Sequence, residues 1–168
     1  MVKATANMLF PRPWHAWILP PAMLQIISVT DDRGALIEPD WLVRAETVHR
    51  ELRPQMPADY VTKMSRVFAG GGRMAIAVAD GEVRGVGVFR IYENTFNGTQ
   101  MYVDDLVTDP SHRSTGVGHA LMQWMQEKAR EFACEAYDLD SGTQRQQAHK
   151  FYFREQMVVT SFHFHKTL

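Results

Sequence analysis

The chain has 168 residues, of which 45% are hydrophobic and 22% are charged, and 18 basic against 19 acidic side chains give a formal net charge of -1. This is the size and composition of one globular domain with enough apolar material for a single core. The balanced charge excludes a general nucleic-acid binder or a basic membrane-surface binder. A single cysteine, Cys134, excludes an intrachain disulfide. We therefore expect a cytoplasmic protein in which this thiol is an inert, packed side chain.

The first 22 residues differ in composition from the rest, because prolines and tryptophans are concentrated there. The prolines interrupt the continuous apolar run of about 20 residues that a membrane span requires. No small-residue cleavage site of a signal peptide stands out. We expect residues 1–22 to form an N-terminal arm, or to be upstream sequence ahead of a start at Met23, and residues 23–168 to form one domain.

Hydrophobic patterns predict the first elements of this domain. An apolar run predicts a strand over residues 23–30, and apolar residues at helical spacing predict helices over 39–52 and 58–69. Three glycines at 70–72 follow. No Lys-Ser/Thr comes after them, as a phosphate-binding loop would require, so they predict a flexible connector.

Three strand-like runs follow, over residues 74–79, 83–92 and 101–107, and the turn signals Asp-Gly and Asn-Gly separate them. Such turns join neighbouring strands as hairpins, so the three runs predict an antiparallel meander. The hairpins exclude a purely parallel, doubly wound sheet.

The last third of the chain is expected to alternate helices and strands. An amphipathic helix follows Pro110 and Ser111, and after it come a strand over 136–139, a helix over 144–154 and a final strand over 157–166. The predicted order for the whole domain is therefore β, α, α, β, β, β, α, β, α, β.

Residues 105–118 carry the first candidate site, because they run from a strand through an Asp-Pro break and a tight loop into a helix. The first amides of a helix lack internal partners, and the helix dipole favours anions at that end. Gly116 and Gly118 have no side chains, so a phosphate can approach the backbone closely. The segment predicts a pyrophosphate cradle. It is not the dinucleotide fingerprint, since Leu121 stands at the third glycine position.

This segment, with its Arg113-x-x-Gly116-x-Gly118 pattern, resembles the acetyl-CoA-binding segment of the GNAT superfamily of N-acetyltransferases. The resemblance implies the α+β GNAT fold, a central mixed and mostly antiparallel sheet flanked by helices. It also implies a bulge in the preceding strand that exposes backbone to the pantetheine arm of acetyl-CoA, the co-substrate. The implied coenzyme-binding residues are Leu106, Val107 and Thr108 at the pantetheine, and Arg113, Ser114, Thr115, Gly116, Val117 and Gly118 at the pyrophosphate.

The helix expected over 144–154 carries a second match, Ala148-x-x-Phe151-Tyr152. It resembles the GNAT helix whose tyrosine lies near the coenzyme sulfur. This implies that Ala148 contacts the coenzyme and that Tyr152 protonates the leaving thiolate, although Tyr152 could also be only a core aromatic. The wider block around it, together with the Phe-His-Phe-x-Lys ending, resembles the aminoalkylphosphonate N-acetyltransferases within GNAT. The general resemblance covers residues 36–168.

Two features depart from the family pattern. Gln156 stands where many GNAT members have glycine. A positive φ is costly at glutamine, so we expect a different turn there. Only 13 residues follow Glu155, enough for one strand where many members have two.

An N-acetyltransferase needs a group that takes the proton of its amine, because alkyl amines are protonated at neutral pH. Asp104 and Asp105 lie on the strand before the coenzyme loop. Successive strand residues point to opposite faces, so only one of the two is expected to face a given cleft. Asp105 is favoured because the phosphonate enzymes that the chain resembles have Glu there. Both carboxylates could instead lie at a solvated strand end.

The first two helices and their loop are expected to build the acceptor pocket, with Glu51, Arg53, Tyr60 and Lys63 as candidate residues. Arg53 and Lys63 could hold a phosphonate or carboxylate, or could be solvated surface charges. The histidines lack a fixed metal-ligand spacing with acidic or thiol partners, so no metal is expected.

Together these features predict an enzyme that moves an acetyl group from acetyl-CoA to the primary amine of a small molecule by direct attack on the thioester. No nucleic-acid or membrane partner is expected, and the protein is expected to be a homodimer. Two alternatives stay open. One is acetylation of a protein or peptide, and the other is an acyl-CoA sensor without turnover.

Overall fold

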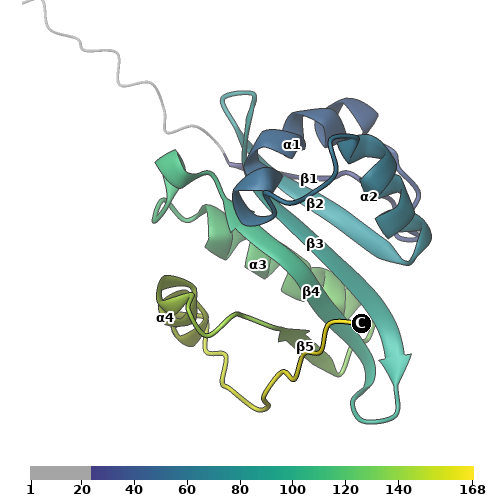
Figure 1. The fold of residues 1–168 in the computed structure, drawn as a ribbon, viewed down its shortest axis with the longest axis vertical. Coiled ribbons are helices and arrows are strands. Elements are labelled where there is room, and N and C mark those ends of the chain that lie inside the picture. The colour runs from purple at the N-terminus through teal and green to yellow at the C-terminus, as the bar shows by residue number, and fades with distance from the viewer. Residues whose placement is uncertain (1–23) are drawn as a thin grey trace, which may run out of the picture.

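The computed structural model describes residues 24–168, so the expected arm over residues 1–22 and the start at Met23 lie outside the described residues (Figure 1). The elements in chain order are β1 (Gln25–Ser28), α1 (Pro39–Leu52), α2 (Tyr60–Ala69), β2 (Gly72–Ala79), β3 (Glu82–Asn94), β4 (Gly98–Thr108), the 3₁₀ helix η1 (Pro110–His112), α3 (Val117–Glu131), β5 (Ala136–Leu139) and α4 (Gln146–Arg154). Every expected element is present except the last strand.

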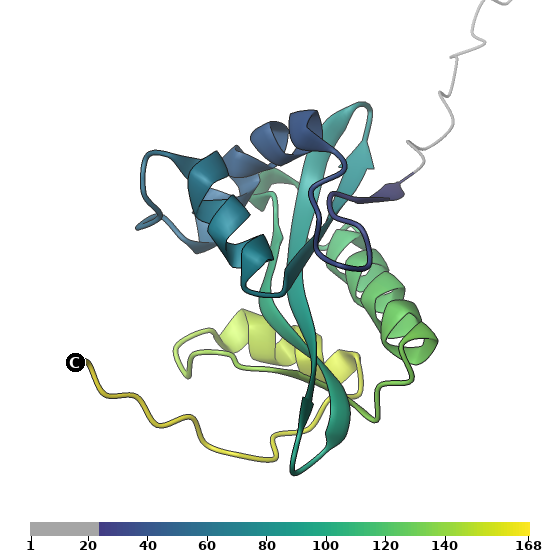
Figure 2. The ribbon, with the colours of Figure 1, turned by 90° about the vertical axis from the view of Figure 1, so that its right-hand side faces the viewer.

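The strands form one sheet in the order β1-β2-β3-β4-β5. The first three pairs are antiparallel, as the hairpin turns predicted, and β4 pairs with β5 in parallel. Helices α1 and α2 cover one face of the sheet and α3 covers the other (Figures 1 and 2). Two clusters of buried side chains fill these two layers. The expected mixed, mostly antiparallel sheet flanked by helices is therefore confirmed.

Alternating residue size on β3 brings α3 close to the sheet. Val86 and Val88 pack in the α1–α2 layer, while Gly85 and Gly87 face α3. A Cβ atom at Gly85 would lie only 2.7 Å from Cγ1 of Val117, the first residue of α3. The missing side chain thus fixes where the N-terminus of α3 sits relative to the sheet.

A β-bulge interrupts the pairing of β3 with β4. Val88 pairs with Asp105 and Phe89 with Val103, so Asp104 is an extra residue on β4. The pairing of β4 with β5 ends at Val103, so from the bulge onward β4 has no strand on its β5 side within the described chain. The bulge implied by the family resemblance is therefore present.

Three local expectations are wrong. Residues 157–166 form no strand, because they make no ladder with any described strand, and a strand needs a partner for its backbone groups. The glycines at 70–72 are not a flexible connector: Gly70 ends α2, Gly72 begins β2, and Arg90 Nη1 donates to the Gly70 carbonyl at 2.8 Å. No different turn replaces the glycine turn at Gln156, which adopts the positive φ itself, at 64°.

Candidate active site

A cavity of about 940 Å³ lies between the end of β4, the loop after it, the start of α3 and one face of α4. Because β5 has already separated from β4 here, the outer edge of β4 faces this space. The predicted coenzyme and acid residues that line the cavity are Leu106, Val107, Thr108, Arg113, Ser114, Gly116, Gly118, Ala148 and Tyr152. The structure thus brings together segments from both sequence motifs.

The loop before α3 is held by its own side chains. Asp109 accepts from the Ser111 amide at 2.9 Å and pairs with His112 Nδ1 at 2.8 Å. The Thr115 hydroxyl donates to the His112 carbonyl at 2.7 Å. Gly116 caps α3 with a φ of 91° and offers no side chain to the helix end. The first amides of α3 therefore keep free donors at the N-terminus of the helix, where an anion is favoured.

Gly118 keeps the backbone of the first α3 turn accessible. A Cβ atom there would lie 3.4 Å from Cζ of Phe151 and 3.6 Å from Cγ2 of Thr108, so only a small side chain fits. Two predicted residues of the same loop do not line the cavity. The Thr115 hydroxyl bonds within the loop, and Val117 is buried against β3. These two residues can reach a coenzyme only through their backbone.

Tyr152 presents its ring to this cavity from α4, beside Phe151, with the two ring centroids 5.5 Å apart. Burial raises the pKa of the Tyr152 phenol above its ordinary value. The hydroxyl therefore stays protonated at neutral pH and can donate a proton. The lining also includes two guanidinium groups that sequence reasoning did not single out, those of Arg145 and Arg154.

A second cavity, of about 560 Å³, lies between the α1–α2 loop, β3, β4 and the segment after β5. Asp104 and Asp105 both line it, together with Arg53 and Lys63. The expectation that only one aspartate faces a given cleft is therefore wrong. The extra residue at the bulge breaks the strict alternation of side chains along β4, so consecutive carboxylates reach the same space.

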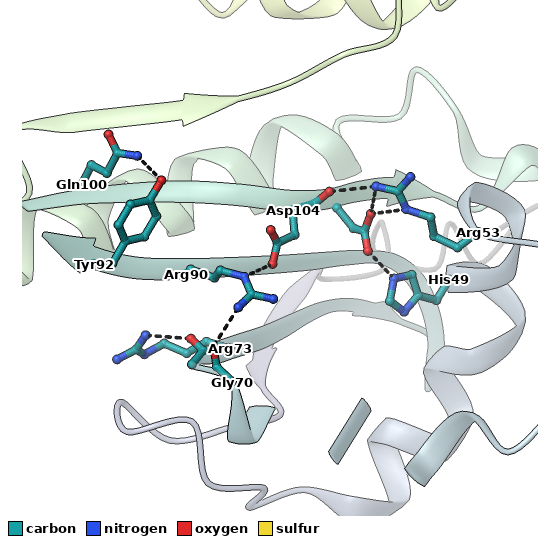
Figure 3. Close-up of polar contacts among 10 residues, drawn as sticks. His49, Arg53, Gly70, Arg73, Arg90, Tyr92, Gln100 and Asp104 are labelled. Atoms are coloured by element: carbon teal, nitrogen blue, oxygen red, sulfur yellow. Dashed lines mark hydrogen bonds and ion pairs between the residues drawn. The ribbon is translucent and has the colours of Figure 1, made fainter. Parts of the chain in front are cut away.

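The two carboxylates have different partners. Asp105 accepts from Arg53 Nε at 2.6 Å and contacts His49 Nε2 at 2.9 Å. Asp104 accepts from Arg90 Nε at 2.7 Å, and its carbonyl accepts from Arg53 Nη2 at 3.1 Å. Figure 3 shows Arg53 and His49 converging on β4 from α1, with Arg90 directed at Asp104 from β3. Burial raises the pKa of the Asp104 carboxyl, although Arg90 opposes that shift.

Two predicted acceptor residues lie elsewhere. Glu51 lines the first cavity, beside the α3–α4 side of the site. Tyr60 lines neither cavity: it is 2% exposed, and its hydroxyl contacts His49 Nδ1 at 2.9 Å. Sequence reasoning missed His49 and Arg90. The signal for His49 was a polar residue on the apolar face of α1, seven residues after the buried Leu42.

The part of the chain that the structure describes has no helix long and apolar enough to span a membrane. The same residues contain no group of three or more side chains placed to hold a metal ion.

Solved acetyltransferases share this fold. An acetyltransferase of Trypanosoma brucei matches 87% of this chain and 100% of its own with a TM-score of 0.69 at 20% identity. An aminoglycoside N-acetyltransferase in complex with CoA matches 90% of this chain and 98% of its own with a TM-score of 0.76 at 17% identity. At such identities the likeness defines the class of fold alone.

Sequence comparisons identify the family. The aminoalkylphosphonate N-acetyltransferase of Salmonella typhimurium is 35% identical over 66 residues, which are 39% of this chain and 43% of that protein. The uncharacterized N-acetyltransferase YhdJ of Bacillus subtilis is 31% identical over 94 residues, 47% of this chain and 66% of that protein. These matches span less than two thirds of either relative. A model of the Acetyltransferase (GNAT) family matches residues 41–156. The chain therefore belongs to the GNAT acetyltransferase family.

Proposed function

We propose that the protein transfers the acetyl group of acetyl-CoA to the primary amine of a small molecule. The observation that carries this proposal is the adjacency of the two cavities. Leu106 lines the first cavity, and its neighbour Asp105 lines the second. Leu52, the last residue of α1, lines the first cavity, and Arg53, the residue after the helix, lines the second. A coenzyme in the first cavity would therefore place its thioester beside the carboxylates of the second.

The first cavity suits the coenzyme. The free amides at the start of α3, next to Arg113, suit a pyrophosphate, and Gly118 leaves room for it. The unpaired edge of β4 over residues 106–108 offers backbone donors and acceptors to the amide groups of pantetheine. Ala148 would contact the coenzyme from α4.

The site residues can manage the protons of direct aminolysis. The amine nitrogen must lose a proton before it bonds to the thioester carbonyl carbon, and we assign that proton to Asp105 first and Asp104 second, directly or through water. After the carbon–nitrogen bond forms, the nitrogen loses a second proton. As the carbon–sulfur bond breaks, the thiolate takes a proton from the Tyr152 phenol, and the phenolate regains one from solvent, which has received the second amine proton. Acetylation then yields a neutral amide and a free thiol, with one net proton released to solvent.

The charges of the second cavity suit an acceptor that carries both an amine and an acidic group. Its lining combines the cations Arg53, Lys63 and Arg90 with the anions Asp104, Asp105 and Asp140. A polycation would find no excess of negative charge there, whereas a zwitterion meets both signs. The name of the Salmonella relative, an aminoalkylphosphonate N-acetyltransferase, fits this chemistry.

We also propose a cytoplasmic homodimer. The lone Cys134 suits a reducing compartment. Large apolar side chains stand exposed in the segment after α4, which is consistent with a partner subunit.

A screen of free-thiol release tests the activity. The wild-type protein and acetyl-CoA are mixed with aminoalkylphosphonates, amino acids, polyamines, aminoglycosides and lysine peptides. We expect release with small amines that carry an acidic group. Release with peptides alone would overturn the small-molecule acceptor. Tight acetyl-CoA binding without release in any mixture would identify a sensor.

Calorimetry on two variants tests the coenzyme site. Gly118→Val should weaken acetyl-CoA binding strongly, because its branched side chain would press on Phe151 and Thr108 and cover the α3 amides. Gly118→Ala is the matched control and should bind much more tightly than Gly118→Val, since one Cβ atom meets only ordinary contacts. Equal affinity in both variants and the wild type would remove this loop from the coenzyme site.

A further inference from the structure

A buried row of polar groups leads away from the acceptor cavity. Asp105 on β4 contacts His49 Nε2 at 2.9 Å, and His49 Nδ1 contacts the Tyr60 hydroxyl at 2.9 Å. Tyr60 is 2% exposed and lines neither cavity, and His49, which borders the acceptor cavity, is only 1% exposed, so its ring offers an acceptor almost no surface. The three residues come from β4, α1 and α2, and the proposed chemistry uses only the first of them.

The positions of the hydrogen atoms in this row follow from the chemistry of the carboxylate at one end and the hydroxyl at the other. An ionised carboxylate only accepts hydrogen bonds, so Nε2 of His49 must carry the hydrogen toward Asp105. In the Nε2–H tautomer, Nδ1 is the acceptor for the Tyr60 hydroxyl. Burial raises the pKa of the Tyr60 phenol, which keeps that hydrogen in place. The Asp105 carboxylate thus selects the tautomer, and the contact of the Tyr60 hydroxyl with Nδ1 holds the orientation of the ring.

The other partner of Asp105 is less well held. The Arg53 side chain is 42% exposed, whereas the His49 side chain is 1% exposed and packed between helix and sheet. A buried ring held at both nitrogens has little freedom to move. Arg53 is also bonded, to the Asp105 carboxylate and the Asp104 carbonyl, but its side chain is longer and more exposed, so it loses more rotamer freedom when it is held. The imidazole is therefore the rigid contact that sets the direction of the Asp105 carboxylate.

We propose that His49 is a positioning residue, which holds the Asp105 carboxylate toward the acceptor cavity and is itself oriented by Tyr60. This role rests on the proposed function, in which Asp105 takes the amine proton. The charged groups around the row are Glu46, Arg50, Arg53, Lys63, Arg90 and Asp104. Substitutions at His49 leave all of these groups in place.

Two variants separate the hydrogen bond from the bulk of the ring. His49→Leu fills part of the space without a donor, and we expect it to lower kcat by about 10- to 100-fold, by analogy with the loss seen when a residue that orients a metal ligand is replaced. His49→Gln places an amide donor near the position of Nε2 and should recover most of that loss. Acetyl-CoA affinity should not change in either variant. Val48→Ala, a neighbouring loss of packing on α1, is the matched control for stability and should keep its turnover.

A double-mutant cycle then decides whether His49 acts through Asp105. If it does, His49→Leu should cost little further turnover once Asp105→Asn is present. Equal losses in both backgrounds would overturn the positioning role and leave the proposed acetyl transfer standing. Failure of the wild-type protein to release thiol with any acceptor would count against the proposed function instead.

One readout needs no activity. Nitrogen-15 NMR of the histidine side chains at neutral pH should show His49 as the Nε2–H tautomer, with that signal changed by Asp105→Asn and by Tyr60→Phe. An Nδ1–H tautomer, or a signal that neither substitution moves, would overturn the proposed row of hydrogen bonds whatever the enzyme acetylates.

Discussion

The carboxylates of Asp104 and Asp105 at the β4 bulge have different hydrogen-bond partners, and the first prediction concerns Asp105. Asp105→Asn removes the proposed proton acceptor and should depress kcat/KM at neutral pH by about 10²- to 10⁴-fold, the usual worth of an acid–base group. Part of the loss should return as pH rises, because more of the substrate amine is then neutral in solution. Acetyl-CoA affinity should change little.

Asp104→Asn is the companion variant in the same pH–rate measurement. It leaves Arg90 without its carboxylate partner but keeps Asp105 and its two contacts, so its effect should be smaller. Wild-type turnover in both variants would remove the carboxylates from the mechanism and leave water or a histidine as the proton acceptor.

Tyr152 carries the second prediction at the scale of one residue. Tyr152→Phe should lower kcat by about 10²-fold while the free energy of unfolding stays close to that of the wild type. The physical reason is that no described residue hydrogen-bonds to the Tyr152 hydroxyl, so its removal breaks no structural contact. Turnover and thermal unfolding are measured on the same preparations.

Tyr137→Phe is the matched control for Tyr152. The Tyr137 hydroxyl is buried and has no hydrogen-bond partner among residues 24–168, so its removal should be neutral or slightly stabilising and should leave turnover unchanged. A Tyr152→Phe enzyme as active as this control would show that Tyr152 is only a packed aromatic side chain.

Sequence reasoning predicted the loop and helix start that line the first cavity, because the physics of a helix N-terminus is local. Gly116 and Gly118 stand beside the residues whose amides they expose. The contacts in the second cavity could not be predicted in this way. His49 and Asp105 are 56 positions apart in the sequence and meet only because α1 packs on β4. The bulge at Asp104 also depends on pairing with β3, which a pattern of alternating residues cannot reveal.

At the scale of elements, the packing of α3 on β3 links the core to the site. Gly85→Ala would place Cβ 2.7 Å from Val117 and 2.8 Å from Leu121. Overpacking of this kind typically costs about 1–3 kcal/mol. Because Val117 begins α3, the displacement should also weaken acetyl-CoA binding. Denaturant unfolding and calorimetry measure the two effects.

Gly87→Ala is the control on the same face of the same strand. Its Cβ would meet the sulfur of Met125 at 3.2 Å, and a methionine side chain can move aside. Met125 also lies two turns into α3, away from the coenzyme amides. We expect a smaller loss of stability and unchanged coenzyme affinity. Equal effects of Gly85→Ala and Gly87→Ala on binding would contradict the proposed link.

Hydrophobic periodicity predicted the helices and strands that bury one apolar face in the core. It failed where a segment's structure depends on pairing with a strand far away in the sequence. Residues close together in the sequence determine the apolar face of α1 and the turns that join β2, β3 and β4. The segment over 157–166 has the composition of a strand, but no described strand pairs with it. Gln156 adopts a positive φ because the end of α4 requires it: the Met157 amide, one residue further on, donates to the Tyr152 carbonyl.

At the scale of the whole molecule, the segment after α4 carries large apolar side chains that are exposed to solvent in the single chain. Figure 2 shows it running out from the sheet. Phe162 and Phe164 are 85% and 92% exposed, although His163 between them pairs with Asp140 at 2.8 Å and lines the acceptor cavity. Exposed large apolar side chains close together in one segment are consistent with a protein–protein contact.

We therefore expect a homodimer in which this segment lies in the interface. Replacing Phe162 and Phe164 together by threonine keeps strand propensity and removes the aromatic area. This should raise the dimer dissociation constant by about 100-fold, as expected if the two copies of each phenylalanine together contribute about 1.4 kcal/mol. Analytical ultracentrifugation over a range of concentrations measures the change. Phe96→Ser, an equally exposed phenylalanine at the β3–β4 turn, is the control and should dimerise like the wild type. A wild-type protein that stays monomeric at every concentration would contradict the dimer. A double variant that dimerises as tightly as the wild type would place the interface on another surface.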